Sequence, residues 1–177
     1  VVAKADAAPE ADVRRVAQAV RVRNPAAPVL RGASVVRLDD PAAVRGRRVL
    51  VVEDGPTLTH GGMPHGAGYA AARAAGAAEI VDPRASATPE IAAVFAAWPH
   101  LGPVLPAMGY DAAQLRGLAQ TIARSTAEVV VSGTPADIGR LLGPAQHVVR
   151  ARYEFAEMDE PGLGAQVDAF LGRIGLV

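Results

Sequence analysis

The chain has 177 residues and no cysteine, which excludes disulfides, thiolate nucleophiles, iron–sulfur clusters and cysteine zinc sites. Eighteen basic residues balance eighteen acidic ones, so no global charge attracts nucleic acid or anionic lipid. Half of the residues are hydrophobic, but no apolar run reaches the roughly 18–20 residues of a membrane span. We therefore expect a globular, cytoplasmic protein of one or two small domains, with no nucleic-acid or membrane partner.

Short apolar segments, mostly β-branched, predict six buried strands, and amphipathic segments between them predict helices. This alternation is typical of βαβ units around a mainly parallel sheet. The predicted fold class is α/β, with three αβα layers. The strands are expected at 28–31, 48–52, 79–81, 102–105, 128–131 and 147–150.

Helices are expected where apolar residues recur at helical spacing behind a capping residue or a proline. Such segments begin at Pro9 or Asp12, at Thr88 and at Asp111, and an alanine-rich helix is expected within 70–78. A further helix is predicted near the end of the chain. In the first helix, the residues expected to face the core are Val13, Val16, Ala17 and Val20. In the last helix, they are Val167, Phe170, Leu171 and Ile174.

A change in composition marks the expected domain boundary. Polar and proline-containing residues at 39–41 follow the first strand and helix pattern. We expect a linker at about 38–46. It would divide the chain into one domain portion at 1–38 and an α/β domain at 39–177.

The stretch 53–68 is the least ordinary part of the sequence, because a buried strand runs into two carboxylates, two threonines, two histidines and five glycines. Ligands bind beyond the carboxyl ends of strands in open α/β sheets. Gly66 and Gly68 would let backbone N–H groups approach an anion at a helix N-terminus; the other interpretation is a long turn with caps. Phosphate binding is predicted for Thr57, Thr59, Gly61, Gly62, His65, Gly66 and Gly68.

Asp54 and His60 are the candidate catalytic residues of this stretch. A carboxylate at a strand end can hold Mg²⁺, so Asp54 is also the predicted metal ligand, but it can equally cap the following turn. His60 can contact a ligand or shuttle a proton, whereas a histidine in a loop is often only hydrogen-bonded at the surface. The two threonines can donate to phosphate or close the turn.

Two later strand ends also carry polar residues. Arg84 can form a bidentate contact with phosphate, or it can pair with Asp82 and stabilise a turn. Thr134 lies in a small-residue loop that leads into a helix, where exposed N–H groups can receive an anion. Tyr110 follows another apolar segment and is interpreted as a half-buried anchor.

Lys4 and Asp6 have the spacing of the base-reading motif Asn-Lys-x-Asp of P-loop GTPases, although Ala3 stands where that motif has asparagine. In the motif the lysine lies along the base and the aspartate accepts hydrogen bonds from guanine. A helix, an apolar segment and then Gly32–Ser34 follow in the order in which those proteins place their last base-contacting loop, so a loop is expected at Gly32–Ser34. Lys4, Asp6 and Ser34 are therefore predicted to bind a nucleotide; the alternative is a strand end followed by a solvated, charged turn.

Four longer runs cover most of the chain: VVEDGPTLTHGGMPHGAGYAAARAAGAAEIVDPR, HLGPVLPAMGY, VVVSGTPADIGRLL and VVRARYEF. They resemble the carboxyl-terminal part of the cyclic 2,3-diphosphoglycerate synthetase family of P-loop proteins. The resemblance implies a P-loop NTPase-like portion over 1–38, followed by a further α/β domain. It also implies a ligase that closes a phosphoanhydride in 2,3-diphosphoglycerate, with ATP or GTP and Mg²⁺ as cofactors.

The sequence contains no Gly-x-x-x-x-Gly-Lys-Ser/Thr motif, so by itself it cannot cradle a triphosphate in the usual way. We therefore expect a carboxyl-terminal fragment or a divergent stand-alone product, inactive alone, with a phosphorylated small molecule similar to 2,3-diphosphoglycerate as its partner. The alternative is a non-catalytic, GTPase-like regulatory or metabolite-binding domain. The neutral net charge is compatible with a homodimer.

Overall fold

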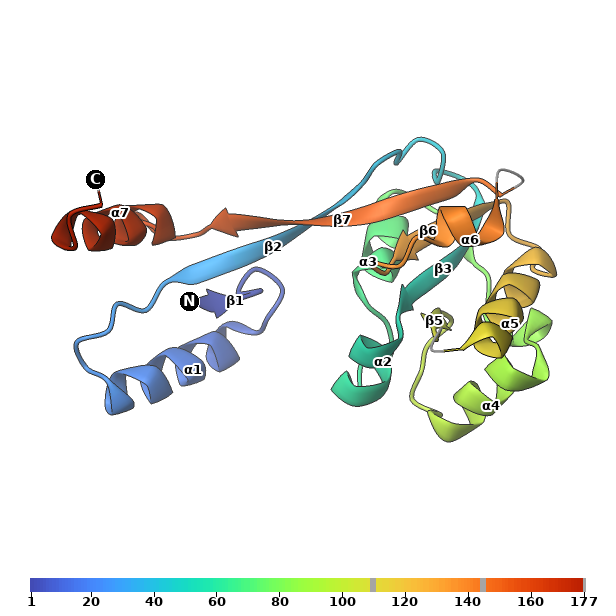
Figure 1. Cartoon of the computed structure of the whole chain (residues 1–177), viewed down its shortest axis with the longest axis horizontal. Coiled ribbons are helices and arrows are strands. Elements are labelled where there is room, and N and C mark those ends of the chain that lie inside the picture. Colours follow the sequence, from blue (N-terminus) through green and yellow to red (C-terminus); the bar gives the residue numbers. More distant parts are fainter. Residues whose placement is uncertain (109–110, 144–145, 177) are drawn as a thin grey trace. The chain divides into compact units, whose positions relative to one another are not determined.

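The computed structural model describes residues 1–108, 111–143 and 146–176, so Tyr110 lies outside the described residues. It shows an α/β protein with a mostly parallel sheet (Figure 1). The chain divides into two compact units. Unit 1 is Val1–Val35 with Tyr153–Val177, and unit 2 is Val36–Arg152. This grouping differs from the division expected at 38/39, which stays a prediction.

β3 (Arg48–Asp54) is the central strand of unit 2. It pairs in parallel with β6 (Val129–Gly133) on one side, and with β4 (Glu79–Ile80) and β5 (Leu105–Ala107) on the other. β7 (Val148–Glu157) continues the sheet in parallel beside β6. Residues 49–53 of β3 are all buried, as expected of a parallel strand covered on both faces. The predicted parallel sheet is confirmed for this unit.

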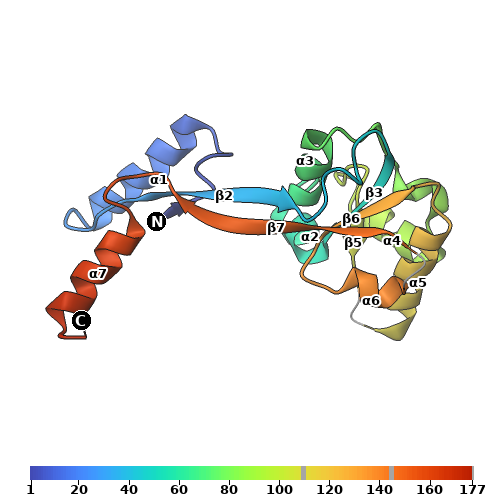
Figure 2. The ribbon, with the colours of Figure 1, turned by 90° about the horizontal axis from the view of Figure 1, so that it is seen from above.

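Helices lie on both faces of this sheet. α3 (Ala67–Ala74) contacts β3 and β6, and Figure 2 shows it on the opposite side of these strands from α5 (Ala112–Ala123). α4 (Pro89–Ala97) packs against α5. Within the described ranges, no helix has the length and apolarity needed to cross a bilayer. Unit 2 also contains α2 (Gly55–Gly61), the 3-10 turn η1 (Pro83–Ser86) and α6 (Ile138–Leu142).

Two helices of unit 2 begin where the capping residues predict. The carboxylate of Asp111 accepts hydrogen bonds from the N–H groups of Ala113 and Gln114, both at 2.8 Å. Pro89 occupies the first turn of α4 behind Thr88, where its missing N–H costs no helical hydrogen bond. The Asp111 cap therefore fixes the start of α5, whereas α4 begins at its proline, because the Thr88 side chain makes no capping hydrogen bond.

Unit 1 combines residues from both ends of the chain. β1 (Val2–Ala3) pairs in parallel with the start of β2 (Arg31–Leu38), and α1 (Glu10–Arg23) connects the two strands. The end of β7 and α7 (Leu163–Arg173) complete the unit. Arg31 Nη2 donates to a carboxylate oxygen of Asp159 at 2.6 Å, and the backbone N–H of Met158 donates to the Arg31 carbonyl at 3.2 Å. These contacts tie β2 to the residues after β7.

The first predicted strand is displaced in the structure. It was expected at 28–31, but β2 begins at Arg31 and ends at Leu38. Pro28 lacks an N–H for strand pairing, whereas the β-branched pair at 35–36 favours extended backbone. As a result Gly32–Ser34 lies inside β2 and not in a loop, so the prediction of a loop at these residues was wrong.

Three other predictions of local structure also need correction. The strand expected at 102–105 begins only at Leu105 and ends at Ala107. The last strand, expected at 147–150, continues to Glu157. The stretch 53–68, expected to be a glycine-rich loop, contains α2, because Asp54 caps a helix that begins with Gly55 and Pro56.

The buried core lies in unit 2 and includes a residue of the predicted linker. Val44 is completely buried and packs with the β3 valines, so the segment 38–46 contributes to the core of this unit. By contrast, the expected core-facing sides of two helices of unit 1 are largely exposed. α7 has no buried residue and Phe170 is 50% exposed, while α1 buries Val13 but leaves Val16 42% exposed. The expected burial was therefore wrong for Phe170 and Val16, and equally for Val20, Val167 and Ile174, which are also exposed.

Candidate functional site

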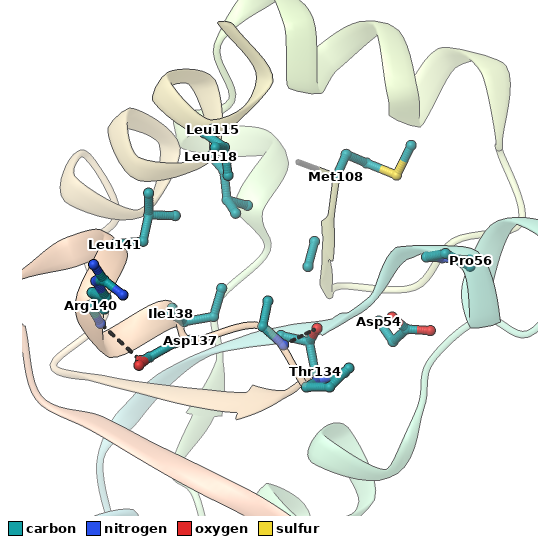
Figure 3. Close-up of a pocket in the computed structure, with 13 residues that line it drawn as sticks. Asp54, Pro56, Met108, Leu115, Leu118, Thr134, Asp137, Ile138, Arg140 and Leu141 are labelled. Atoms are coloured by element: carbon teal, nitrogen blue, oxygen red, sulfur yellow. Dashed lines mark hydrogen bonds between the residues drawn. The ribbon is translucent and has the colours of Figure 1, made fainter. Parts of the chain in front are cut away.

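A cavity of about 610 Å³ lies in unit 2, at the carboxyl ends of three neighbouring parallel strands (Figure 3). Asp54 ends β3, Ala107 ends β5 and Thr134 follows β6, and all three residues line the cavity. Cavities of roughly 300–1,000 Å³ hold small molecules, and this edge of an open α/β sheet is where ligands bind. The cavity is therefore the candidate functional site.

Asp54 and Thr134 are the predicted site residues that the structure brings together in this cavity. The Asp54 carboxylate is half-buried, and its Oδ2 atom accepts hydrogen bonds from the Thr57 N–H at 3.2 Å and the Thr57 hydroxyl at 2.7 Å. Thr134 is buried, and its hydroxyl oxygen accepts the Ala136 N–H at 3.2 Å. Asp54 thus caps α2 and still presents its carboxylate to the cavity.

The opposite end of the cavity carries Asp137 and Arg140, which the sequence prediction did not assign to the site. Asp137 precedes α6, and its Oδ1 atom accepts the backbone N–H of Arg140 at 3.0 Å. The signal for both was an aspartate followed three residues later by an arginine at a predicted helix start. That pattern is common in helix caps, so the sequence alone does not assign these two residues to a site. Their position in the cavity does. Apolar side chains form the rest of the cavity wall: Met108, Leu115, Leu118, Ile138 and Leu141.

Glu53 occupies the position at the start of α3 where the sequence predicted a bound anion. Its side chain is 1% exposed, and Oε1 accepts the N–H of Gly66 at 3.2 Å and of Tyr69 at 2.8 Å. A β-carbon on Gly66 would lie 2.6 Å from Glu53 Oε2, and one on Gly133 would lie 2.4 Å from it. These glycines therefore make room for a carboxylate of the protein itself. Phosphate binding by Gly66 and Gly68 stays a prediction.

Burial raises the pKa of the Glu53 carboxyl, because the charged form loses its water. The N–H groups of Tyr69, Gly68 and Gly66 act in the opposite direction by stabilising the carboxylate, and the neighbouring charge of Asp54 adds to the rise. The pKa of Glu53 is raised overall, because the effect of burial is the largest. Glu53 is the most strongly buried acidic residue of this sheet edge, although it does not line the cavity.

The other predicted residues of 57–68 lie outside the cavity lining. The Thr59 hydroxyl is buried and donates to the Gly55 carbonyl at 3.0 Å. His60 is exposed, with its ring edge-on to Trp98 at a centroid distance of 6.4 Å. The ring of His65 stacks on Tyr69 at 4.3 Å. Gly61 ends α2, and Gly62 follows it in the left-handed conformation, with φ of 64°.

Arg84 is engaged in the local structure around η1. Its guanidinium pairs with Asp82 at 3.1 Å and donates to the carbonyls of Leu101 and Gly102 at 2.6 and 3.2 Å. It also lies over the ring of Phe95, 4.2 Å from the centroid. This arrangement matches the turn-stabilising interpretation of Arg84, and its predicted phosphate contact remains without a test.

Unit 1 brings together two of the three residues predicted to bind a nucleotide. Asp6 Oδ1 accepts the Ser34 N–H at 2.9 Å. Lys4 is exposed and adopts a left-handed backbone conformation with φ of 57°, which non-glycine residues adopt uncommonly. Lys4 and Asp6 follow β1 and Ser34 lies in β2.

Asp54 is the residue best suited to Mg²⁺ at the candidate site. No cluster of three or more histidine, cysteine, aspartate or glutamate side chains in the described part of the chain could hold a metal ion. Mg²⁺ in nucleotide-dependent enzymes is, however, commonly held by one or two carboxylates together with phosphates and water. The second oxygen of Asp54, which accepts no hydrogen bond from described residues, fits that kind of site.

Comparison with known proteins shows a curated relative of the chain. No protein-family model matches the chain. The chain is 46% identical over 163 residues to arginine synthetase ArcE of Thermococcus kodakarensis, and the match covers 92% of this chain and 36% of the relative. The chain therefore spans about a third of the length of this curated relative and is similar to it along nearly all of its own length.

Proposed function

We propose that the chain is part of a ligase or synthetase that forms arginine, with the cavity of unit 2 as the site of its amino-acid substrate. The observation that carries the proposal is the 46% identity over 163 residues to a protein named arginine synthetase. The matched region includes nearly all of the chain. The proposal therefore transfers a synthetase role, and arginine as the product, from the relative to this protein.

The charges around the cavity favour an amino acid over a phosphorylated acid. Two carboxylates, Asp54 and Asp137, and one guanidinium, Arg140, are the charged side chains that line it among the described residues. A doubly phosphorylated acid such as 2,3-diphosphoglycerate would bring several negative charges to a site with more acidic than basic groups, and like charges repel. A zwitterionic molecule meets charges of both signs. This electrostatic balance favours an α-amino acid over a phosphorylated acid as the ligand of the cavity.

The proposal retains ATP or GTP and Mg²⁺ as cofactors, with residues 1–38 as the end of a P-loop NTPase-like domain. The nucleotide would supply the driving force for bond formation, as it does in ligases. Asp54 would hold Mg²⁺ with its free oxygen, while Thr57 fixes the other oxygen and so orients the carboxylate. Lys4, Asp6 and Ser34 are the proposed contacts to the base.

Arginine formation by the natural gene product that contains these 177 residues tests the proposal. The protein is incubated with the amino-acid fraction of a cell extract, Mg²⁺ and either ATP or GTP, and arginine is quantified by mass spectrometry. We expect arginine to accumulate only when a nucleotide is present. A parallel incubation contains 2,3-diphosphoglycerate in place of the amino acids. A cyclic product in that incubation, with no arginine formed in the first one, would contradict the proposal. Binding of metabolites with no turnover of any nucleotide would favour the non-catalytic alternative instead.

A further inference from the structure

The two ends of the cavity in unit 2 carry different polar side chains. Figure 3 shows Asp54 and Thr134 toward one end, and Asp137 and Arg140 at the other, with apolar side chains such as Ile138 between them. The apolar wall offers no polar group that could hold a charge in the middle of a ligand. The cavity is therefore complementary to a molecule with charged or polar groups at both ends and an apolar segment in the middle.

At one end of the cavity, Asp137 offers a negatively charged side chain and Arg140 a positively charged one. The two side chains do not form an ion pair with each other. Asp137 accepts the backbone N–H of Arg140 through Oδ1, at 3.0 Å, which leaves Oδ2 for another donor. Among the described residues no acidic side chain pairs with the Arg140 guanidinium. Arginine is the side chain best shaped to bind a carboxylate with two parallel hydrogen bonds.

We infer that Asp137 and Arg140 bind the head group of an α-amino acid, whose side chain then extends along the apolar wall toward Asp54. Asp137 accepts hydrogen bonds from the α-ammonium group, and Arg140 pairs with the α-carboxylate. The inference rests on the proposed function, which it deepens by assigning which end of the substrate lies where. It places the end group of the amino-acid side chain beside Asp54 and Thr134.

Local structure holds the Asp137 carboxylate in one orientation. The hydrogen bond from the Arg140 N–H to Asp137 closes the first turn of α6, so the carboxylate cannot rotate freely. Ile138, the first residue of α6, is 2% exposed and anchors this turn in the core. An anchored turn loses little conformational entropy when a ligand binds, which increases affinity.

In this arrangement, one end of the cavity binds the head group of the amino acid and the other end holds the group that reacts. The head group of every α-amino acid is the same, so Asp137 and Arg140 select the class of substrate. The length of the wall and the groups near Asp54 select the side chain. The reacting group of the proposed synthetase is thereby brought to the carboxyl ends of β3 and β6, where Asp54 is available for Mg²⁺.

Calorimetric binding of two ligands to the natural gene product tests the inference. The ligands are arginine and agmatine, which has the same guanidinium and methylene chain but no α-carboxylate. The variants are Arg140→Gln, Asp137→Asn, which keeps an effective cap for α6, and Arg124→Gln as the matched control. Arg124 is exposed at the end of α5 and does not line the cavity. Thermal unfolding of each variant confirms that it is folded.

The wild-type protein is expected to bind arginine about tenfold or more tightly than agmatine, because a charge-assisted pair with a carboxylate is lost in agmatine. Arg140→Gln should remove that preference by weakening arginine about tenfold while leaving agmatine unchanged. Asp137→Asn should weaken both ligands, and Arg124→Gln neither. Equal affinities of the wild type for the two ligands, or equal weakening of both by Arg140→Gln, would overturn the inference.

The inference and the proposed function fail separately. Nucleotide-dependent arginine formation that Arg140→Gln leaves with an unchanged KM for the amino acid would overturn the inference and leave the function intact. Arginine binding that depends on Arg140, in a protein that forms no arginine, would support the head-group site and overturn the proposed function.

Discussion

The Oε1 atom of Glu53 accepts the backbone N–H of Tyr69 at 2.8 Å, so a buried carboxylate of β3 closes the first turn of α3. A negative charge is favourable at a helix N-terminus, where N–H groups are unpaired and the helix dipole is positive. This contact joins the central strand to the helix that covers it. Several measurable consequences depend on how tightly the carboxylate is enclosed.

Gly133→Ala is expected to destabilise the protein. The new β-carbon would lie 2.4 Å from Glu53 Oε2, so the carboxylate or β6 must shift, and overpacking of this kind costs roughly 1–3 kcal/mol. Gly172→Ala is the matched control, because nothing lies within 4 Å of its added β-carbon and the site is helical. Urea denaturation gives both free energies of unfolding. An equal effect of the two substitutions would contradict the close packing around Glu53.

Glu53→Gln is expected to change how stability depends on pH. Because the pKa of Glu53 is raised in the folded protein, folding favours the protonated form. This contribution to stability is complete below the unfolded pKa of about 4.3 and decreases as the pH rises through the folded pKa. Glutamine does not titrate, so the variant should gain stability relative to the wild type as the pH rises. Denaturation at a series of pH values measures the difference in free energy of unfolding between the variant and the wild type. If the wild type instead gained stability relative to the variant as the pH rises, the raised pKa would be contradicted.

Asp159→Asn should have the opposite pH signature. The hydrogen bond from Arg31 lowers the pKa of the Asp159 carboxyl, so its contribution to stability is present above the unfolded pKa of about 3.9 and is lost as the pH falls through the folded pKa. The variant should be less stable than the wild type near pH 7 and match it in acid. Asp168→Asn, an exposed change on α7, serves as the control. A stability difference independent of pH would show that the Arg31 pair does not set the titration.

Polar substitution on α7 is expected to leave stability nearly unchanged. Phe170 is 50% and Ile174 51% exposed, so replacing both by serine should change the free energy of unfolding by about 0.5 kcal/mol or less per site. Phe95→Ala is the comparison, since Phe95 is 7% exposed and loss of a buried phenylalanine costs roughly 3–5 kcal/mol. Chemical denaturation distinguishes the two cases. A large loss on α7 would mean that its apolar side is buried in solution.

Local patterns predicted much of the fold. The valine-rich run of β3, the cap Asp111 and the helix-starting Pro89 can each be recognised from a few neighbouring residues, and the structure confirms these elements. The apolar side of α7 misled the prediction, because periodicity shows which residues share a side but not whether another element covers it. Burial depends on contacts far along the chain.

The candidate site was predicted only in part for the same reason. Asp54 and Thr134 stand at strand ends and could be selected by position. Glu53 was missed because its burial depends on the parallel register that places it beside Gly133, a pairing that no local pattern specifies. The same register brings Arg140, only a few residues after β6, to the cavity that Asp54 lines.

A steady-state kinetic comparison of two cavity variants and one control variant of the natural gene product tests the central claim most directly, by measuring nucleotide-dependent arginine formation. The account predicts that Arg140→Gln raises the KM for the amino acid about tenfold with a smaller change in kcat, because it removes a contact to the head group. Asp54→Asn should lower kcat about tenfold or more and leave that KM nearly unchanged, while Asp168→Asn changes neither. Wild-type kinetics in both cavity variants would contradict the assignment of this cavity as the site of a synthetase.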